Sequence, residues 1–173
     1  MSVTILIVDD HEVLRKGVRS ILERARPQWE ICGEAASGQQ AIEAAFSLRP
    51  NIILLDITMP GMSGLEAAAR ISALHVNSKI LIFTMHESGE LARDARKAGA
   101  CGYVTKSDAS RQLVSAIETL LYGGTFFGNA EKPPSDARPG AAILLFRSLV
   151  VADWPPWGLG ALTHVYCRGA GPI

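Results

Sequence analysis

The chain lacks a net charge that would attract nucleic acid. Its 173 residues hold seventeen Lys and Arg against seventeen Asp and Glu, so the formal net charge is zero. The same balance holds within residues 1–128, which contain thirteen basic and fourteen acidic residues. A domain of this kind has no electrostatic footprint for a phosphate backbone, which argues against nucleic-acid binding by this part of the chain.

Cysteines and long apolar runs are scarce as well. Cys32, Cys101 and Cys167 are odd in number and scattered, so we expect reduced, small apolar residues in place of disulfides or metal ligands. No apolar run is long enough to span a bilayer, and the N-terminus has no basic stretch followed by a long apolar one. We therefore expect a cytoplasmic protein without a secretion signal or membrane span.

The composition changes near Asn129. Residues 129–173 hold six of the nine prolines and two of the three tryptophans, but only seven charged residues. Proline and glycine at this density interrupt every helix of useful length. We predict one domain over residues 1–128 and an irregular Pro/Gly/Trp-rich tail over residues 129–173, with no recognisable domain in the tail.

Four short apolar runs each end on polar residues of a different chemical kind. The runs and the residues that follow them are 5–8 before Asp9 and Asp10, 52–55 before Asp56, 80–83 before Thr84, and 102–105 before Lys106. Such runs are typical of buried parallel strands, whose carboxyl ends lie at one edge of a sheet. We therefore expect the acidic pair, the lone carboxylate, the hydroxyl and the amine to be neighbours.

Apolar residues at helical spacing fill the gaps between these runs. They predict helices over residues 13–22, 41–46, 65–74, 91–98 and 113–122, and residues 30–35 form one further expected strand. Strands that alternate with helices of about ten residues imply βαβ units around a parallel sheet. The predicted class is α/β, with five strands and five helices.

The residues at this edge suit phosphate chemistry. Asp9, Asp10 and Asp56 would repel one another unless a cation lay among them, and hard oxygen ligands suit Mg²⁺. A carboxylate can take a phosphoryl group as a nucleophile, while a metal and a lysine neutralise the phosphoryl oxygens. Asp56 is then the predicted acceptor, Lys106 the counter-charge, and Thr84 the hydroxyl that binds the new phosphoryl group.

Each residue has a simpler interpretation when taken alone. A single Asp after a strand is usually a turn or cap residue, and Gly61 and Gly64 fit either ordinary turn chemistry or a close approach of backbone to the site. The four polar types together, in this order, favour the phosphate site. His11 and His86 flank it in the sequence, but Mg²⁺ prefers oxygen, so we expect a modulating role only.

These segments resemble the receiver domains of two-component response regulators, in particular those of the NarL/FixJ (LuxR-type) transcription factors. The resemblance covers about residues 3–127 and rests on four segments, Ile7 to His11, Leu55 to Gly64, Phe83 to His86, and Gly99 to Lys106. It implies a flavodoxin-like parallel sheet of strand order 2-1-3-4-5 with helices on both faces.

The resemblance also assigns roles in phosphorylation. It implies that Asp56 accepts phosphate from a sensor histidine kinase, and that Thr84 and Lys106 hold the phosphoryl group. Mg²⁺ is then bound by Asp10, Asp56 and the backbone carbonyl of Thr58, with Asp9 helping through water. The chain would catalyse its own phosphotransfer and its own slow dephosphorylation, without being a conventional enzyme.

Tyr103 is the remaining residue with an implied role. An aromatic residue in a strand is more often a packing residue, but Tyr103 lies three residues before Lys106, at the switch position of the family. The resemblance implies that its ring turns inward when Thr84 moves toward the phosphoryl group. A changed surface could then bring about a homodimer.

Two other functions stay open. The family continues into a helix-turn-helix DNA-binding domain, but residues 129–173 show no such element, and their four basic residues make no basic helix face. DNA binding is therefore doubtful, and a LuxR-type transcriptional regulator with an unreadable output domain is the second hypothesis. A phosphohydrolase is the third, although haloacid-dehalogenase-like phosphatases have a second Asp where this chain has Thr58.

Overall fold

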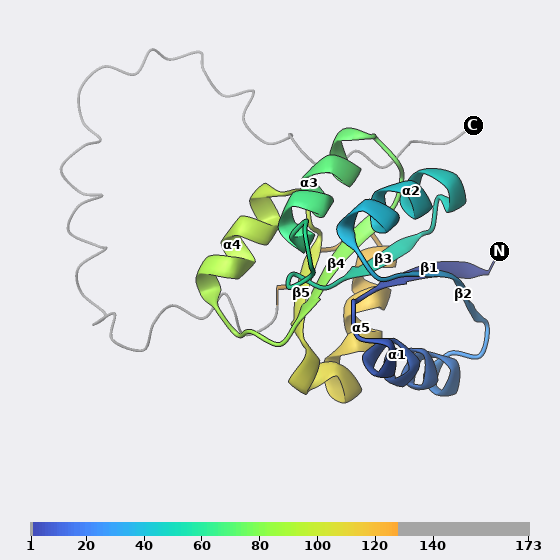
Figure 1. Ribbon diagram of the computed structural model, residues 1–173. Coiled ribbons are helices and arrows are strands. Elements are labelled where there is room, and N and C mark those ends of the chain that lie inside the picture. Colours follow the sequence, from blue (N-terminus) through green and yellow to red (C-terminus); the bar gives the residue numbers. More distant parts are fainter. Residues whose placement is uncertain (1, 128–173) are drawn as a thin grey trace, which may run out of the picture. The chain divides into compact units, whose positions relative to one another are not determined.

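A parallel sheet of five strands lies between two layers of helices in the computed structural model, which describes residues 2–127 (Figure 1). The strands are β1 (Val3–Val8), β2 (Trp29–Ala35), β3 (Ile52–Leu55), β4 (Lys79–Thr84) and β5 (Gly102–Thr105). The helices are α1 (Glu12–Ala25), α2 (Gly38–Leu48), α3 (Gly64–Ala73), α4 (Gly89–Lys97), the short 3-10 helix η1 (Lys106–Asp108) and α5 (Ala109–Leu121). The predicted tail over residues 129–173 lies outside the described residues.

The strands are arranged in the order β2-β1-β3-β4-β5, and every neighbouring pair is parallel. This confirms the predicted flavodoxin-like α/β fold. The strand order reverses at β1, because β2 lies on one side of it and β3 on the other. Ligands of open α/β sheets bind at this point, beyond the carboxyl ends of the strands.

Each central strand divides its side chains between the two helical layers. Alternate residues of β1 and β3 point to opposite faces, so Leu6 and Ile53 pack in the core beneath α2, α3 and α4. Ile5 and Ile52 pack on the other face, in the core beneath α1 and α5. All four side chains are fully buried, which explains why the strands read as unbroken apolar runs.

Three helices on one face of the sheet begin at a serine cap. The hydroxyls of Ser37, Ser63 and Ser88 accept hydrogen bonds from backbone N–H groups in the first turns of α2, α3 and α4. Each cap satisfies a donor that has no partner within the helix. The serines therefore fix where these helices start after the loops that leave the sheet.

The chain returns along β5 after the last helix. Gly102 forms a parallel bridge with Phe126, whose backbone N–H donates to the carbonyl of Cys101 at 3.0 Å. Phe127 is buried in the same core as Tyr103, and the Arg96 guanidinium lies 4.1 Å from its ring centroid. The unpaired edge of β5 is thereby partly covered, which limits edge-to-edge association.

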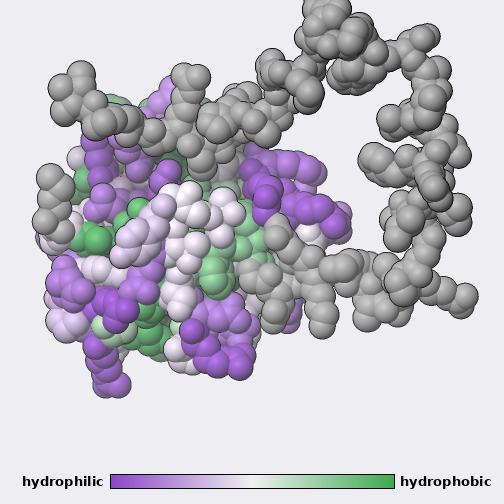
Figure 2. All heavy atoms as spheres, turned by 180° about the vertical axis from the view of Figure 1, so that it is seen from behind, coloured by the Kyte–Doolittle hydropathy of each residue, from purple (hydrophilic) through white to green (hydrophobic). Residues whose placement is uncertain are grey.

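The surface of the described part is mostly polar. Figure 2 shows one face, on which hydrophilic side chains predominate and hydrophobic ones form patches among them. Within residues 2–127 no helix has the length and apolar character that a bilayer crossing requires.

Candidate functional site

Asp9 and Asp56 follow the carboxyl ends of two neighbouring strands. Val8 of β1 is in register with Leu55 of β3, so the next residue of each strand stands at the same edge. The backbone N–H of Asp56 donates to the carbonyl of Val8 at 3.0 Å. The sheet thus brings together two carboxylates that are far apart in the sequence, as predicted.

Lys106 joins these two carboxylates. Its Nζ lies 2.7 Å from Asp9 Oδ2 and 2.8 Å from Asp56 Oδ2, and all three side chains are at most 5 % exposed. A buried carboxylate is costly unless a cation or hydrogen-bond donors satisfy it. One ammonium therefore stabilises two like charges, and the three groups together keep a net negative charge that suits a further cation.

Asp10 is the more open member of the acidic pair. Its side chain is 25 % exposed, and His11 Nδ1 lies 2.8 Å from its Oδ1 and 3.4 Å from Asp9 Oδ1. The contact with Asp10 is close enough for an ion pair when the imidazole is protonated, but Oδ1 of Asp10 is buried and accepts no hydrogen bond within the described residues. That oxygen retains free lone pairs at the edge of the site.

The loop after Asp56 is shaped by glycine. A Cβ on Gly64 would lie 1.8 Å from the backbone oxygen of Asp56, so only glycine fits this close approach. Gly61 has a φ of +79°, a conformation that other residues rarely adopt. The N–H of Ile57 donates to Asp56 Oδ1 at 2.8 Å, which orients the carboxylate. Gly64 is therefore required by a close approach to the Asp56 backbone, and Gly61 by a positive φ in the loop.

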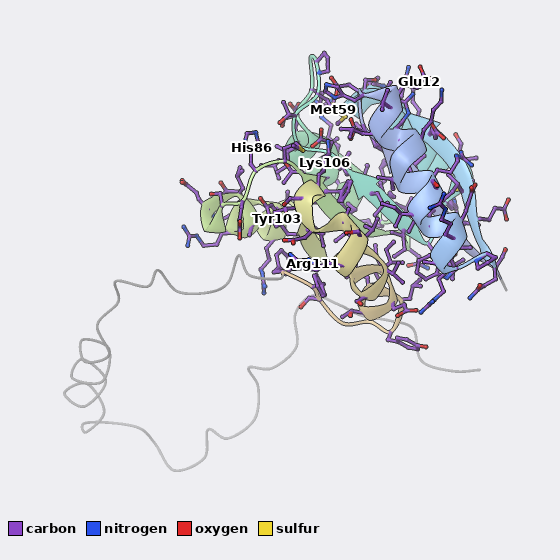
Figure 3. The ribbon with its side chains drawn as sticks, turned by 90° about the horizontal axis from the view of Figure 1, so that it is seen from below. Glu12, Met59, His86, Tyr103, Lys106 and Arg111 are labelled. Atoms are coloured by element: carbon purple, nitrogen blue, oxygen red, sulfur yellow. The ribbon has the colours of Figure 1, made fainter. Side chains whose placement is uncertain are left out.

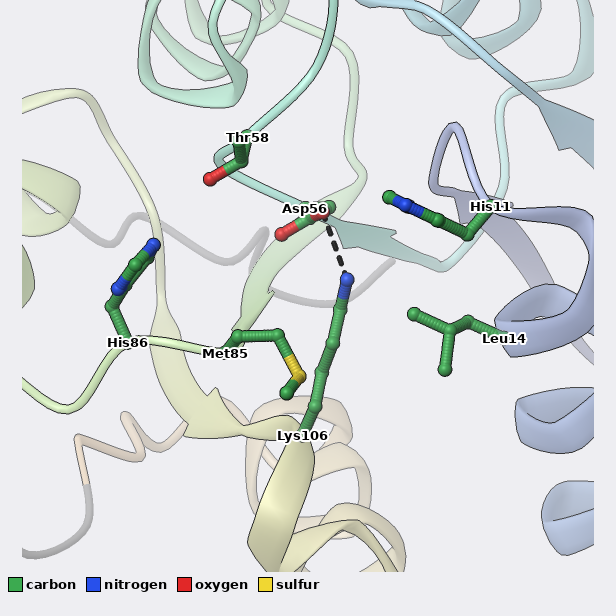
Figure 4. Close-up of a pocket in the computed structure, with 7 residues that line it drawn as sticks. All are labelled: His11, Leu14, Asp56, Thr58, Met85, His86 and Lys106. Carbon is green, nitrogen blue, oxygen red and sulfur yellow. Dashed lines mark hydrogen bonds and ion pairs between the residues drawn. The ribbon is translucent and has the colours of Figure 1, made fainter.

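A pocket of about 320 Å³ opens above Asp56 (Figure 4). It is lined by His11, Leu14, Asp56, Thr58, Met85, His86 and Lys106. In Figure 4, His11 and Leu14 lie on one side of Lys106, and Met85 and His86 lie on the other. The pocket gives the otherwise buried Asp56 carboxylate an approach for a small anionic group.

Thr84 and Tyr103 lie close to the pocket without lining it. Thr84 ends β4 and is fully buried, and its Oγ1 accepts a hydrogen bond from the backbone N–H of His86 at 3.4 Å. The Tyr103 hydroxyl donates to the backbone carbonyl of His86, and burial raises the pKa of this phenol. Tyr103 is 2 % exposed, so its ring is already turned inward here, in the position that the resemblance assigned to the switched state; Figure 3 shows it near His86.

The sequence pattern did not place Arg15, Met85 or Leu14 at the site; Leu14, expected only within an apolar helix, lines the pocket. Arg15 of α1 donates to the backbone carbonyl of Asp9 at 2.7 Å, although a basic residue on a helix is normally expected to be solvated. Met85, which is 66 % exposed, forms part of the pocket rim. None of these three residue types carries a local signal for the site, because each contact depends on how two elements meet in space.

Comparison with known proteins places most of the described chain within a single family model. Residues 5–118 match the model of the response regulator receiver domain. The nitrate/nitrite response regulator protein NarL of Escherichia coli is 38 % identical over 130 residues, which are 75 % of this chain and 60 % of that protein. The chain thus spans about three fifths of the length of the curated relatives it matches.

Solved structures agree in fold. A two-component response regulator of the LuxR family from an Aurantimonas species superposes with a TM-score of 0.70 at 40 % identity, covering 73 % of this chain and 90 % of that chain. The response regulator domain of Thermotoga maritima CheB superposes with a TM-score of 0.65 at 24 % identity, covering 70 % of this chain and 98 % of that one. At that lower identity, the second likeness concerns the fold alone.

Proposed function

The chain belongs to the response regulator receiver domain family, close to the NarL and LuxR-type two-component regulators of transcription, and on this premise we propose that Asp56 is its phosphoacceptor. The observation that carries the proposal is the contact of Asp56 with Lys106 at the floor of the pocket. A carboxylate with a fixed ammonium beside it can attack a phosphoryl group whose negative oxygens the ammonium then neutralises. The expected donor is a sensor histidine kinase.

The protein groups proposed for the transfer all lie at the pocket. An Asp56 oxygen forms a bond to phosphorus as the bond from phosphorus to the donor's nitrogen or oxygen breaks. The Ile57 N–H holds the other face of the carboxylate through Asp56 Oδ1, so little reorganisation is required. Receiver domains are not conventional enzymes, and the catalysis proposed here is limited to phosphotransfer onto Asp56 and to slow hydrolysis, in which water attacks phosphorus, the Asp56 oxygen leaves and inorganic phosphate is released.

Receiver domains bind Mg²⁺ in an acidic pocket, and the residues at this site fit that ion. The donor set is made of hard oxygens, and the buried Asp10 Oδ1 accepts no hydrogen bond from the described residues, with His11 Nδ1 as its neighbour at 2.8 Å. We assign the ion to Asp10, Asp56 and the backbone carbonyl of Thr58, with Asp9 helping through water. When bound, Mg²⁺ would supply positive charge to the phosphoryl oxygens.

His11 also stands at this acidic group. Its Nδ1 and carboxylate oxygens of Asp9 and Asp10 lie within 4.8 Å of one another. The imidazole is 65 % exposed, and Mg²⁺ prefers oxygen to nitrogen, so His11 is proposed to flank the ion without binding it.

The proposed switch runs through Thr84 and Tyr103. A phosphoryl group on Asp56 adds acceptor oxygens and about −1.5 to −2 charges, so the Thr84 hydroxyl gains a partner that competes with the His86 N–H. Phosphorylation can shift the population only through such differential contacts. A rearrangement of the segment around His86 would change the surface at α4 and β5, where partners or a second copy could bind.

DNA binding is the second candidate, favoured by the likeness to regulators of the LuxR family. DNA binding ranks second because the proposed domain division leaves a receiver over residues 1–128 and only a short tail over 129–173 to bind DNA. The sequence of the tail offers no helix-turn-helix, and the tail lies outside the described residues.

The test is intact-mass measurement of the full chain after incubation with magnesium and acetyl phosphate. The wild type should gain one phosphate, and Asp56→Asn, which keeps the size of the side chain, should gain none. Labelling of Asp56→Asn would contradict the choice of carboxylate. An aliquot of phosphorylated protein tested on DNA separates the first candidate from the second.

A further inference from the structure

Arg15 connects the metal-binding loop to two other elements. Its Nη1 donates to the backbone carbonyl of Asp9 at 2.7 Å, and its Nε donates to Glu34 Oε2 at 2.9 Å. Only 14 % of the side chain is exposed. One guanidinium on α1 therefore reaches the loop after β1 and the end of β2 at the same time.

The partner on β2 is itself held in place. Glu34 is in register with Ile7 of β1, next to the loop that carries the acidic pair. Hydrogen bonds from Arg19 and Arg15 hold the pKa of the Glu34 carboxyl below its usual value. Glu34 is therefore a charged acceptor that fixes the direction of the Arg15 fork, since the fork's N–H groups point along fixed directions.

The carbonyl that Arg15 binds belongs to the peptide between Asp9 and Asp10. A peptide unit is planar, so holding this carbonyl also holds the N and Cα atoms of Asp10. The N–H of Asp9 donates to the carbonyl of Ala35 at 3.1 Å, which fixes the preceding peptide as well. The Arg15 hydrogen bond thus holds the backbone from which the Asp10 side chain projects, and the buried Oδ1 of that side chain accepts no hydrogen bond, although His11 Nδ1 lies 2.8 Å away.

We propose that Arg15 is a positioning residue for magnesium, which acts by orienting the Asp9–Asp10 peptide so that the Asp10 carboxylate is preorganised for the ion. The proposal rests on the magnesium site of the proposed function and adds a residue that touches neither the metal nor the phosphoryl group. Preorganisation of this kind raises affinity by lowering the ordering cost of binding.

Arg19 provides a matched control. It lies one helical turn after Arg15 on α1 and binds the same partner, with its Nη2 2.6 Å and its Nε 3.1 Å from Glu34 Oε1. Its hydrogen bonds and ion pairs go to Glu34 and Glu23, not to Asp9. Replacing Arg19 therefore removes the link between α1 and β2 on one side while the Asp9 carbonyl keeps its donor.

The experiment measures magnesium binding to the full chain by calorimetry, without phosphodonor, for the wild type, Arg15→Gln and Arg19→Gln. Arg15→Gln should weaken binding about tenfold, the loss expected for one hydrogen bond with a charged donor, and Arg19→Gln should stay within about twofold. Equal affinity of Arg15→Gln and wild type, or equal weakening in both variants, would overturn the proposal. Urea unfolding verifies that each variant is folded.

The rate of phosphorylation by acetyl phosphate as a function of magnesium concentration gives a second readout. Arg15→Gln should need about tenfold more magnesium for half its maximal rate, yet reach the wild-type maximum at saturation. If the phosphorylation rate of Arg15→Gln stayed below the wild-type maximum at saturating magnesium, Arg15 would act by a route other than metal binding. A wild type that binds magnesium but takes no phosphate would contradict the proposed function and leave the calorimetric comparison valid.

Arg15→Lys is a second test variant, which keeps the proposal testable if Arg15→Gln does not fold. A lysine has one terminal nitrogen and no fork, so it cannot hold the Asp9 carbonyl and Glu34 in the same way. Its magnesium affinity should lie between those of the wild type and Arg15→Gln, or below the wild type if Arg15→Gln does not fold. Wild-type affinity in Arg15→Lys would refute the need for the fork.

Discussion

Thr84 and Tyr103 are joined through the backbone of His86. The His86 N–H donates to Thr84 Oγ1 at 3.4 Å, and the His86 carbonyl accepts from the Tyr103 hydroxyl. Both residues are buried: Thr84 is fully buried, and Tyr103 is 2 % exposed. A movement of the threonine hydroxyl therefore acts on the same residue that holds the phenol, which gives the proposed switch a short physical route.

Tyr103→Phe should separate phosphorylation from its structural consequence. The ring still fills its place in the core and the pocket is unchanged, so we expect Asp56 to be phosphorylated at a near-normal rate. The hydrogen bond to the His86 carbonyl is lost. NMR shifts of the His86 amide on phosphorylation should differ from those of the wild type. The same shift changes in both proteins would show that the hydroxyl plays no part in the switch.

Lys106→Met should destabilise the magnesium-free protein by roughly 3 kcal/mol, because it leaves two buried carboxylates without their shared cation. Saturating magnesium should restore part of that loss, and urea unfolding with and without the ion measures both effects. Lys97→Met is the control, since Lys97 is 77 % exposed where it pairs with Asp94, and its loss should cost little.

Some phosphorylation should survive the loss of Lys106, but it should be uncoupled from the change at Tyr103. The reason is that Asp56 remains the nucleophile while the phosphoryl oxygens lose their ammonium partner. Unaltered switching of the Tyr103 resonances on phosphorylation of Lys106→Ala would contradict the assigned role.

Gly64→Ala should be far more damaging than Gly61→Ala. A methyl group at residue 64 would collide with the Asp56 backbone at 1.8 Å, so the loop must shift and take the acceptor with it. At residue 61 nothing lies within 4 Å, and only the φ of +79° penalises alanine, by about 1 to 2 kcal/mol. Thermal unfolding and acetyl phosphate labelling of the two variants test this contrast.

Phe127→Ala should cost about 3 kcal/mol of unfolding free energy. Phe127 is 5 % exposed, and removal of its ring leaves a cavity in the core that also holds Tyr103 and takes away the aromatic face that Arg96 packs on. Tyr122→Ala is a suitable comparison, because Tyr122 is 91 % exposed and should change stability little. Similar urea midpoints for both variants would mean that the segment at β5 does not contribute to the core.

Glu34→Gln should make the free energy of unfolding fall less steeply as the pH is lowered. Hydrogen bonds from Arg19 and Arg15 lower the pKa of folded Glu34 below its usual value of 4.5. The ionised form therefore stabilises the fold above about pH 4.5, and this contribution disappears as the pH falls through the folded pKa. The gap between wild-type and Glu34→Gln urea midpoints should narrow over that window, and a constant gap would refute the linkage.

The sequence alone determined the framework and the chemical types at the site. Apolar runs of strand length that alternate with helical periodicity predicted the parallel α/β fold, and the structure confirmed it with boundaries shifted by a few residues; α1, for example, runs over Glu12–Ala25. Because strand ends of a parallel sheet share one edge, Asp9, Asp56, Thr84 and Lys106 could be grouped before any contact was known.

Only the tertiary structure decided how those groups are connected. A lysine after a strand is solvated by any local rule, yet Lys106 is 5 % exposed between two carboxylates. The links from Thr84 to Tyr103 through His86 and from Arg15 to the Asp9 carbonyl likewise join separate elements. Periodicity reports which face of an element is buried, whereas hydrogen bonds between elements depend on distances of a few tenths of an ångström, which arise only when the elements pack.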